Sequence, residues 1–196
     1  THAGVSPGRI TRIFLTHLHG DHCLGLPGVL QRLALDGVDE PVPVAFPASG
    51  LPYVERLCDA TIGRRPPVEL VPVAEEGAVV VDGALRVSAL PLSHRVPALG
   101  WRMEEPPSVH LLPDRLAAAG VAGPDAGRLL AEGSIEVGDR RVTLADVGER
   151  RPGRSAAVVM DTAACNNAVR LAAGVDVLLC EATFLERESF LARDYG

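Results

Sequence analysis

The segment His17-Leu18-His19-Gly20-Asp21-His22 places four potential metal ligands within six residues, directly after the apolar stretch 9–16. That stretch, RITRIFLT, is rich in β-branched and aromatic residues and predicts a buried strand. Side chains two positions apart in an extended chain point the same way, so His17 and His19 can reach one ion together. We expect Gly20 to let the chain turn, so that Asp21 and His22 face a second ion.

Two further candidate ligands lie far along the chain. His94 follows the apolar stretch 86–92, and Asp161 follows the apolar stretch 155–160. Each lies where a predicted strand emerges into a loop, the usual position of functional residues on a layered sheet fold. Taken alone, His94 is compatible with a structural role and Asp161 with a cap on the next helix. Imidazoles and carboxylates together suit zinc.

Composition limits the class of protein. The chain has 196 residues, of which 47% are hydrophobic, enough for one domain with a packed core. No apolar run approaches the roughly 20 residues that span a bilayer, and no signal peptide is recognisable. The four cysteines form no C-x-x-C pair, and we interpret them as small buried residues in a reducing cytoplasm rather than as disulfides or ligands. The net charge of −6 argues against a general nucleic-acid-coating protein.

The order of predicted elements indicates a layered α+β or α/β sandwich, with strands in two clusters and helices between them. Residues 24–35 predict a helix with Leu26, Val29, Leu30 and Leu33 on its inner face. Residues 104–153 differ, because they are rich in Pro and Gly and carry a hairpin signal at Gly138-Asp139. A compact core has no need of such an excursion, so we interpret it as a protruding insertion.

These motifs resemble those of a known family. THLHGDH is similar to the H-x-H-x-D-H signature of the metallo-β-lactamase superfamily, and the surrounding residues 14–30 resemble ribonuclease Z more specifically. Residues 160–184 are similar to that family's Gly-Asp-Thr and His-Glu-Ala-Thr strand ends. The insertion, with Gly123-Pro124, resembles the flexible arm with which bacterial ribonuclease Z clamps tRNA.

The resemblance implies a four-layer αββα sandwich, the metallo-β-lactamase fold, in which residues 1–196 form one domain that lacks both termini and residues 104–153 form the inserted arm. It implies two zinc ions. His17, His19 and His94 would hold the first ion, Asp21 and His22 the second, and Asp161 would bridge them. Asp21 would also act as the general base towards the attacking water.

The sequence departs from the family pattern at several points. Met160 replaces the usual Gly, and Cys180 stands where His is common, although Glu181 remains. A His-Ser/Thr motif with a general acid and a late Thr-His motif with the last zinc ligand are absent from these residues. The opening strands of the family's first sheet are missing as well. We therefore expect that both ends have been cut from a longer natural chain.

The implied activity is zinc-dependent endonucleolytic removal of the 3′ trailer from precursor tRNA, by a cytoplasmic homodimer that is not membrane-bound. Arg128, Arg140 and Arg141 on the arm are candidate RNA contacts, with further arginines at its return; a solvated face is an equally good interpretation of this charge. Two alternatives stay open. One is another hydrolase of the superfamily, acting on a thioester, lactone or small phosphodiester. The other is an inactive metal-binding fragment.

Overall fold

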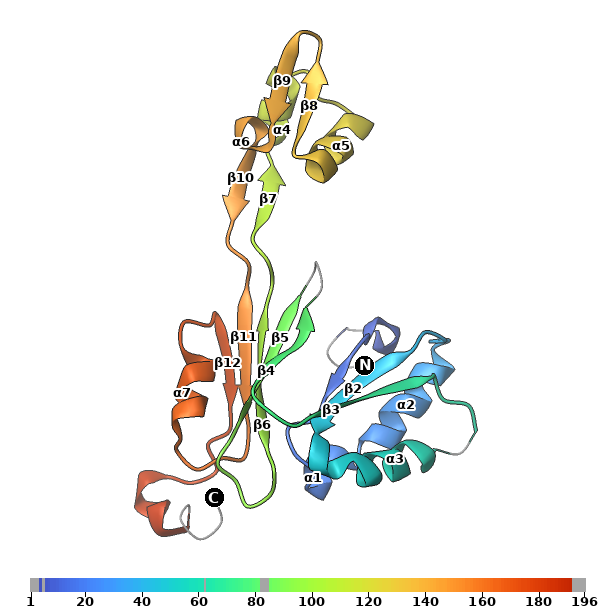
Figure 1. The fold of residues 1–196 in the computed structure, drawn as a ribbon, viewed down its shortest axis with the longest axis vertical. Coiled ribbons are helices and arrows are strands. Elements are labelled where there is room, and N and C mark those ends of the chain that lie inside the picture. Colours follow the sequence, from blue (N-terminus) through green and yellow to red (C-terminus); the bar gives the residue numbers. More distant parts are fainter. Residues whose placement is uncertain (1–3, 5, 62, 82–84, 192–196) are drawn as a thin grey trace. The chain divides into compact units, whose positions relative to one another are not determined.

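The computed structural model describes residues 4, 6–61, 63–81 and 85–191. The chain forms two compact units (Figure 1). The larger unit consists of Thr1–Met103 with Ser155–Gly196, and the smaller unit is Glu104–Arg154. The elements that carry the candidate ligands all belong to the larger unit.

The first half of the larger unit is a parallel three-stranded sheet in the order β1-β2-β3. Its strands are β1 (Ile13–Phe14), β2 (Val42–Pro47) and β3 (Val68–Val73). Its helices are α1 (Gly20–Cys23), α2 (Leu26–Leu35) and α3 (Leu51–Asp59), with short 3-10 turns η1 (Pro7–Arg9) and η2 (Ala48–Gly50). Leu30 of α2 and Val54 of α3 are completely buried in one core with Phe46 of β2. Parallel connections need such helices, which cover the sheet and bury one face of it.

The second half is a five-stranded sheet in the order β12-β11-β6-β5-β4. Its strands are β4 (Gly77–Val81), β5 (Arg86–Pro91), β6 (Leu99–Glu104), β11 (Ser155–Val159) and β12 (Val177–Cys180). Helix α7 (Asn166–Ala172) packs on this sheet through the buried Leu171, beside the β11 and β12 ribbons in Figure 1. A separate core joins Ala45 of β2 to Ala89 of β5 and Trp101 of β6. The two sheets therefore face each other, with helices on their outer sides.

The smaller unit has a core of its own. Its elements are β7 (Ser108–Leu111), α4 (Pro113–Ala118), α5 (Pro124–Glu132), β8 (Ser134–Val137), β9 (Arg140–Thr143), α6 (Leu144–Val147) and β10 (Gly148–Arg151). Strands β7 and β10 form one antiparallel ribbon, and β8 and β9 form a hairpin at Gly138-Asp139 as predicted. Val121, Leu129, Ile135 and Val142 are buried together.

Several local predictions are wrong in detail. The predicted strand 9–16 contains only the two strand residues Ile13–Phe14, because Pro7–Arg9 form a 3-10 turn. The predicted helix 24–35 begins at Leu26, and Val29 is 38% exposed rather than on the inner face. Cys180 is exposed, unlike the buried Cys23 and Cys58, and all four cysteines are free thiols. None of the helices among the described residues combines the length and apolar character that crossing a membrane requires.

Strand β12 lies at the edge of the five-stranded sheet and is exposed on both faces. It pairs in parallel with β11 on one side, and among the described residues no strand pairs with its other side. Val177 and Leu179 are 61% and 55% exposed, and Leu178 on the opposite face is also exposed. Parallel strands with apolar residues on both faces are normally covered on both sides.

Gly100 tests the packing between α7 and the second sheet. A Cβ atom at this position would overlap Leu171 Cδ1 and lie 3.3 Å from the carbonyl oxygen of Val158. We expect Gly100→Ala to lower the free energy of unfolding by about 1–3 kcal/mol, because an overfilled core must shift. Guanidinium denaturation measures this change.

Gly28→Ala provides the control, because Gly28 lies in α2 and a Cβ there would meet no atom within 4 Å. Replacing a helical glycine with alanine should stabilise the protein by up to about 1 kcal/mol. Equal denaturation midpoints for the two variants would contradict the packing described.

Candidate metal centre

The candidate ligands lie at three strand ends of the larger unit. His17 and His19 follow β1, with His19 in extended backbone, and Asp21 and His22 lie on the single turn of α1. His94 follows β5, and Asp161 follows β11. In the sheet order, β5 and β11 are the two neighbours of β6, so their ends lie close together.

Three imidazoles converge through their ring nitrogens. His17 Nε2 lies 3.1 Å from His19 Nδ1, and His94 Nε2 lies 3.2 Å from the same His19 atom. Each such contact is favourable only if a hydrogen or a cation lies between the two nitrogens. Two nitrogens on one tetrahedral zinc, each bound at about 2.05 Å, are about 3.3 Å apart. The observed separations fit a shared metal ion.

Asp161 completes this group. Its Oδ2 lies 3.6 Å from His17 Nε2, and its Oδ1 lies 3.1 Å from His22 Nε2. Ligand atoms of His17, His19, His94 and Asp161 all lie within 4.8 Å of one another. The carboxylate thus presents one oxygen to each side, the arrangement that a bridging ligand needs.

Two buried polar atoms at the site have no hydrogen-bond partner among the residues that the structure describes. They are Asp161 Oδ1 and His94 Nδ1. Asp161 Oδ1 is close enough to His22 for electrostatic attraction, but the angles do not make a hydrogen bond. Unsatisfied buried polar groups are rare in native proteins and often mark a missing ion or water. This observation and the donor set both fit a metal ion.

Burial keeps the central imidazoles neutral. His17 is completely buried, and desolvation, reinforced by the nearby His22, lowers its pKa to about 4. Burial also lowers the pKa of His94, against the opposing effect of Asp161. Neutral imidazole is the form that binds metal ions.

Backbone and side-chain hydrogen bonds connect the loops that carry His17, His94 and Asp161. The backbone N–H of Ala163 donates to Ser93 O at 2.8 Å, and the backbone N–H of Ser93 donates to Thr162 Oγ1 at 3.1 Å. These bonds tie the residue before His94 to the residues after Asp161. The backbone N–H of Leu99 donates to Thr16 O at 2.8 Å, which ties β6 to the residue before His17.

Asp21 occupies a different position from the four clustered ligands. Its side chain is 79% exposed and lies 3.4 Å from His22 Nε2. The predicted second ligand group is therefore arranged as Asp21, His22 and Asp161, with His22 between the two carboxylates. The chain turns at Gly20, as expected. Gly20 is the first residue of α1, and the single turn of this helix places Asp21 and His22 side by side.

Two neighbours of the ligands had no predicted role. Thr162 follows Asp161, and its hydroxyl accepts the bond from Ser93 described above. Glu181 follows β12, and desolvation together with the adjacent Asp161 carboxylate raises its pKa. The short motif Met160-Asp161-Thr162 was the available signal for Thr162.

The candidate RNA-contacting arginines differ in their surroundings. Arg128 is paired with Asp125 at 3.1 Å and with Glu132 at 3.6 Å, and Arg141 donates to Ser134 Oγ at 2.8 Å. The guanidinium groups of Arg140, and of Arg150 and Arg151 on β10, make no direct hydrogen bond or ion pair with any residue that the structure describes. The charge of Arg140 nevertheless contributes to lowering the pKa of Asp146.

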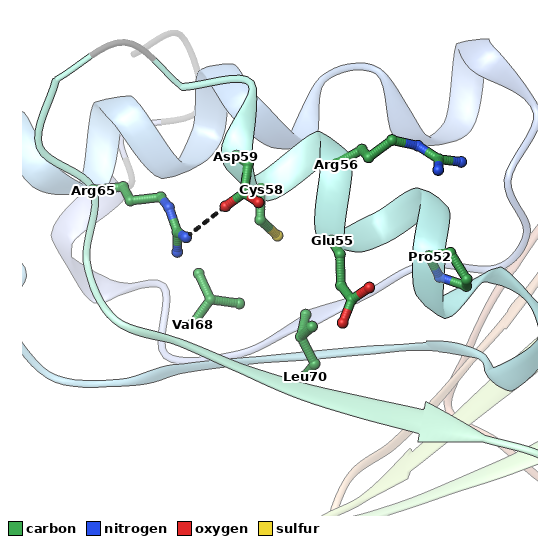
Figure 2. Close-up of a pocket in the computed structure, with 8 residues that line it drawn as sticks. All are labelled: Pro52, Glu55, Arg56, Cys58, Asp59, Arg65, Val68 and Leu70. Carbon is green, nitrogen blue, oxygen red and sulfur yellow. Dashed lines mark hydrogen bonds and ion pairs between the residues drawn. The ribbon is translucent and has the colours of Figure 1, made fainter.

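A surface hollow of about 390 Å³ lies between α3 and β3 (Figure 2). Arg65 and Asp59 form an ion pair across one end of it at 3.0 Å. Its lining consists of Pro52, Glu55, Arg56, Cys58, Asp59, Arg65, Val68 and Leu70. Because none of the candidate ligands lines it, the metal centre is separate from this hollow.

Comparison with known proteins identifies the class. Residues 2–120 match the family described as the β-lactamase superfamily domain. This match covers more than half of the chain, and the chain belongs to that superfamily.

Individual relatives are more specific. The chain is 51% identical to ribonuclease Z of Nocardia farcinica over 99% of its own length and 64% of that protein's. It is also 51% identical to ribonuclease Z of Thermobifida fusca, over 99% of its own length and 62% of that protein's. The resemblance predicted from the motifs is confirmed, and the chain spans less than two thirds of the length of these relatives.

Solved structures confirm the metallo-β-lactamase fold. The short form of human tRNase Z superposes with a TM-score of 0.60 at 20% identity, covering 98% of this chain and 65% of that one. The metallo-β-lactamase fold protein YhfI of Bacillus subtilis superposes with a TM-score of 0.55 at 10% identity, covering 93% of this chain and 54% of that one. At these identities the similarity concerns the fold alone.

Replacing His19 tests the ligand cluster, because His19 Nδ1 is the atom that both other imidazoles approach. We expect His19→Ala to weaken metal binding by more than the roughly 10–100-fold typical of losing an outer-shell group. Metal competition with a chromophoric chelator measures the affinity. His110→Ala, at an exposed histidine on β7, is the control and should leave the affinity unchanged. Equal metal affinities for the two variants would contradict the cluster.

Proposed function

We propose that these residues belong to a zinc-dependent endoribonuclease that removes the 3′ trailer from precursor tRNA. The observation that carries this proposal is the 51% identity to ribonucleases Z over 99% of the chain, which includes both the ligand motifs and the smaller unit. The products would be a tRNA with a 3′ hydroxyl and a trailer with a 5′ phosphate.

We further propose two zinc ions as cofactors. His17, His19 and His94 would hold one ion, Asp21 and His22 the other, and Asp161 would bridge them. The contact distances around His19 and the two-sided position of Asp161 support this division. Bound zinc supplies Lewis acidity, which makes water a stronger acid and stabilises negative charge on a phosphodiester oxygen.

Residues of this chain then have distinct tasks. The exposed carboxylate of Asp21 is accessible to a substrate and accepts the proton of the attacking water. The water oxygen bonds to phosphorus, the bond from phosphorus to the 3′ oxygen of the tRNA breaks, and that oxygen takes up a proton from solvent or from a general acid outside these residues to give the 3′ hydroxyl. The buried His17 and the loop hydrogen bonds at Ser93 hold the ligands in fixed positions while this happens.

The smaller unit is proposed to contact the tRNA through guanidinium groups that bind phosphates. Arg140, which is free of direct ion pairs among the described residues, is better suited to this role than Arg128, whose charge is already compensated by Asp125 and Glu132. Arg141 is bound to a neutral hydroxyl and keeps its full charge. A cytoplasmic location and a homodimer remain predictions from the family resemblance.

Incubation of the full natural chain and zinc with a 3′-extended precursor tRNA tests the activity. We expect Asp21→Asn to lower kcat by about 10²–10⁴-fold, the usual contribution of a general base. Glu55→Gln, the same chemical change at an exposed position of α3, should leave kcat unchanged. An intact trailer after incubation with the unaltered protein would refute the proposed reaction, and cleavage of thioesters or lactones instead would favour another superfamily hydrolase.

RNA binding tests the arginines separately from catalysis. In the Asp21→Asn background, where the RNA stays intact, we expect Arg140→Ala to weaken binding to all precursor tRNAs. The slope of log affinity against log salt concentration should fall by about 1. Arg128→Ala should change the slope less, because Asp125 and Glu132 compensate its charge. Electrophoretic mobility shifts at several salt concentrations measure both, and a larger effect at Arg128 would contradict this ranking.

A further inference from the structure

Gly50 is a buried glycine at the junction of η2 and α3, and it lies against Leu18. A Cβ atom built on Gly50 would overlap Leu18 Cδ1 and lie 3.2 Å from Leu18 Cγ. The three nearest atoms to that Cβ, outside the adjacent residues of the chain, all belong to Leu18. The isobutyl group of Leu18 therefore occupies the space that a side chain at position 50 would need.

The backbone at this position does not itself require glycine. Gly50 has φ −90° and ψ 3°, a conformation that residues with a side chain also adopt. It follows that the contact with Leu18 is the feature that demands a glycine here.

Leu18 stands between His17 and His19 in the ligand loop. It packs against the first core, which also contains Leu15, Cys23 and Val54. Leu18 is thus the side chain through which the core holds the middle of the His17–His19 segment.

The surface that receives Leu18 is rigid. Helix α3 begins at Leu51 and buries Val54, Leu57 and Cys58, and η2 follows directly on the central strand β2. Ligand side chains on a metal site must be held to within about 0.5 Å, and such precision comes from packed secondary structure rather than from the loop itself.

We propose that Gly50 is a positioning residue for the metal centre. Its missing side chain leaves a notch for Leu18, and the seated Leu18 fixes the separation of the His17 and His19 ring nitrogens. This inference rests on the metal site of the proposed function. A side chain at position 50 displaces Leu18 Cδ1 from the notch and also presses on Cγ, so Leu18 can no longer pack in the same position beside the two imidazoles.

Cobalt(II) binding to the full natural chain tests this role, because the visible absorption of bound cobalt reports its coordination geometry independently of turnover. We expect Gly50→Val to weaken cobalt binding by about 10–100-fold, the range for outer groups that orient ligands. Its absorption spectrum should also change. Gly50→Ala, a smaller intrusion, should produce the same changes to a lesser degree and guards against a variant that fails to fold.

Rescue separates positioning from a purely structural effect. Gly50→Val adds three carbons and Leu18→Ala removes three, so the double variant restores the packed volume. We expect the double variant to recover the wild-type cobalt spectrum and an affinity within about threefold, since contacting residues show such coupling. Gly25→Val is the control, because Gly25 is exposed and a Cβ there would meet no atom within 4 Å.

The outcomes are distinguishable. Unchanged cobalt affinity and spectrum in both Gly50 variants would overturn the proposal, even if thermal unfolding revealed a loss of stability. Failure of Leu18→Ala to rescue Gly50→Val would overturn it as well, because Gly50 would then act by another route. If the unaltered chain bound no cobalt at all, the metal site would be refuted, and the inference with it.

Discussion

The complete burial of His17 is the constraint around which the metal centre is arranged. Its ring lies 4.1 Å from that of His22, measured between centroids, and meets His19 and His94 edge to face. Four imidazoles this close repel one another if they are protonated, and desolvation removes that repulsion by holding the pKa of His17 near 4. Because the ring of His17 stays neutral, its lone pair is available to a cation.

The proximity of His17 and His19 could be predicted from their spacing in the sequence. The proximity of His94 and Asp161, which lie far apart in the chain, could not be predicted from spacing. The two-residue spacing of His17 and His19 suits extended backbone, which the structure has at His19, and the two ring nitrogens do meet at 3.1 Å. The meeting of His94 with Asp161 depends on strand order, since β5 and β11 both neighbour β6, and no local pattern encodes that order. Their family resemblance, rather than periodicity, brought these two residues into the predicted site.

The errors have physical causes. Val29 was placed inside because it is apolar, yet the inner face of α2 is defined by Leu26, Leu30 and Leu33. The contact of Leu18 with Gly50 joins residues 32 positions apart and left no recognisable signal.

The smaller unit is not strongly basic, although the proposed substrate is RNA. Residues 104–154 contain seven arginines against nine acidic residues, a net charge of −2. Several arginines pair with acidic residues of the same unit. Arg154, for example, donates from Nε to Glu105 Oε2 at 3.1 Å and from Nη2 to Glu105 Oε1 at 3.2 Å. RNA binding through such a unit must come from a few individual contacts rather than from a general positive potential.

The exposed strand β12 has a consequence for the behaviour of these residues in solution. An open strand edge with Val177, Leu178 and Leu179 turned towards water offers unpaired backbone groups beside an apolar surface. Such edges are templates for intermolecular β-pairing and for aggregation. A recombinant polypeptide limited to these residues is therefore expected to lose solubility as its concentration rises, and a charged residue at position 178 is the simplest remedy.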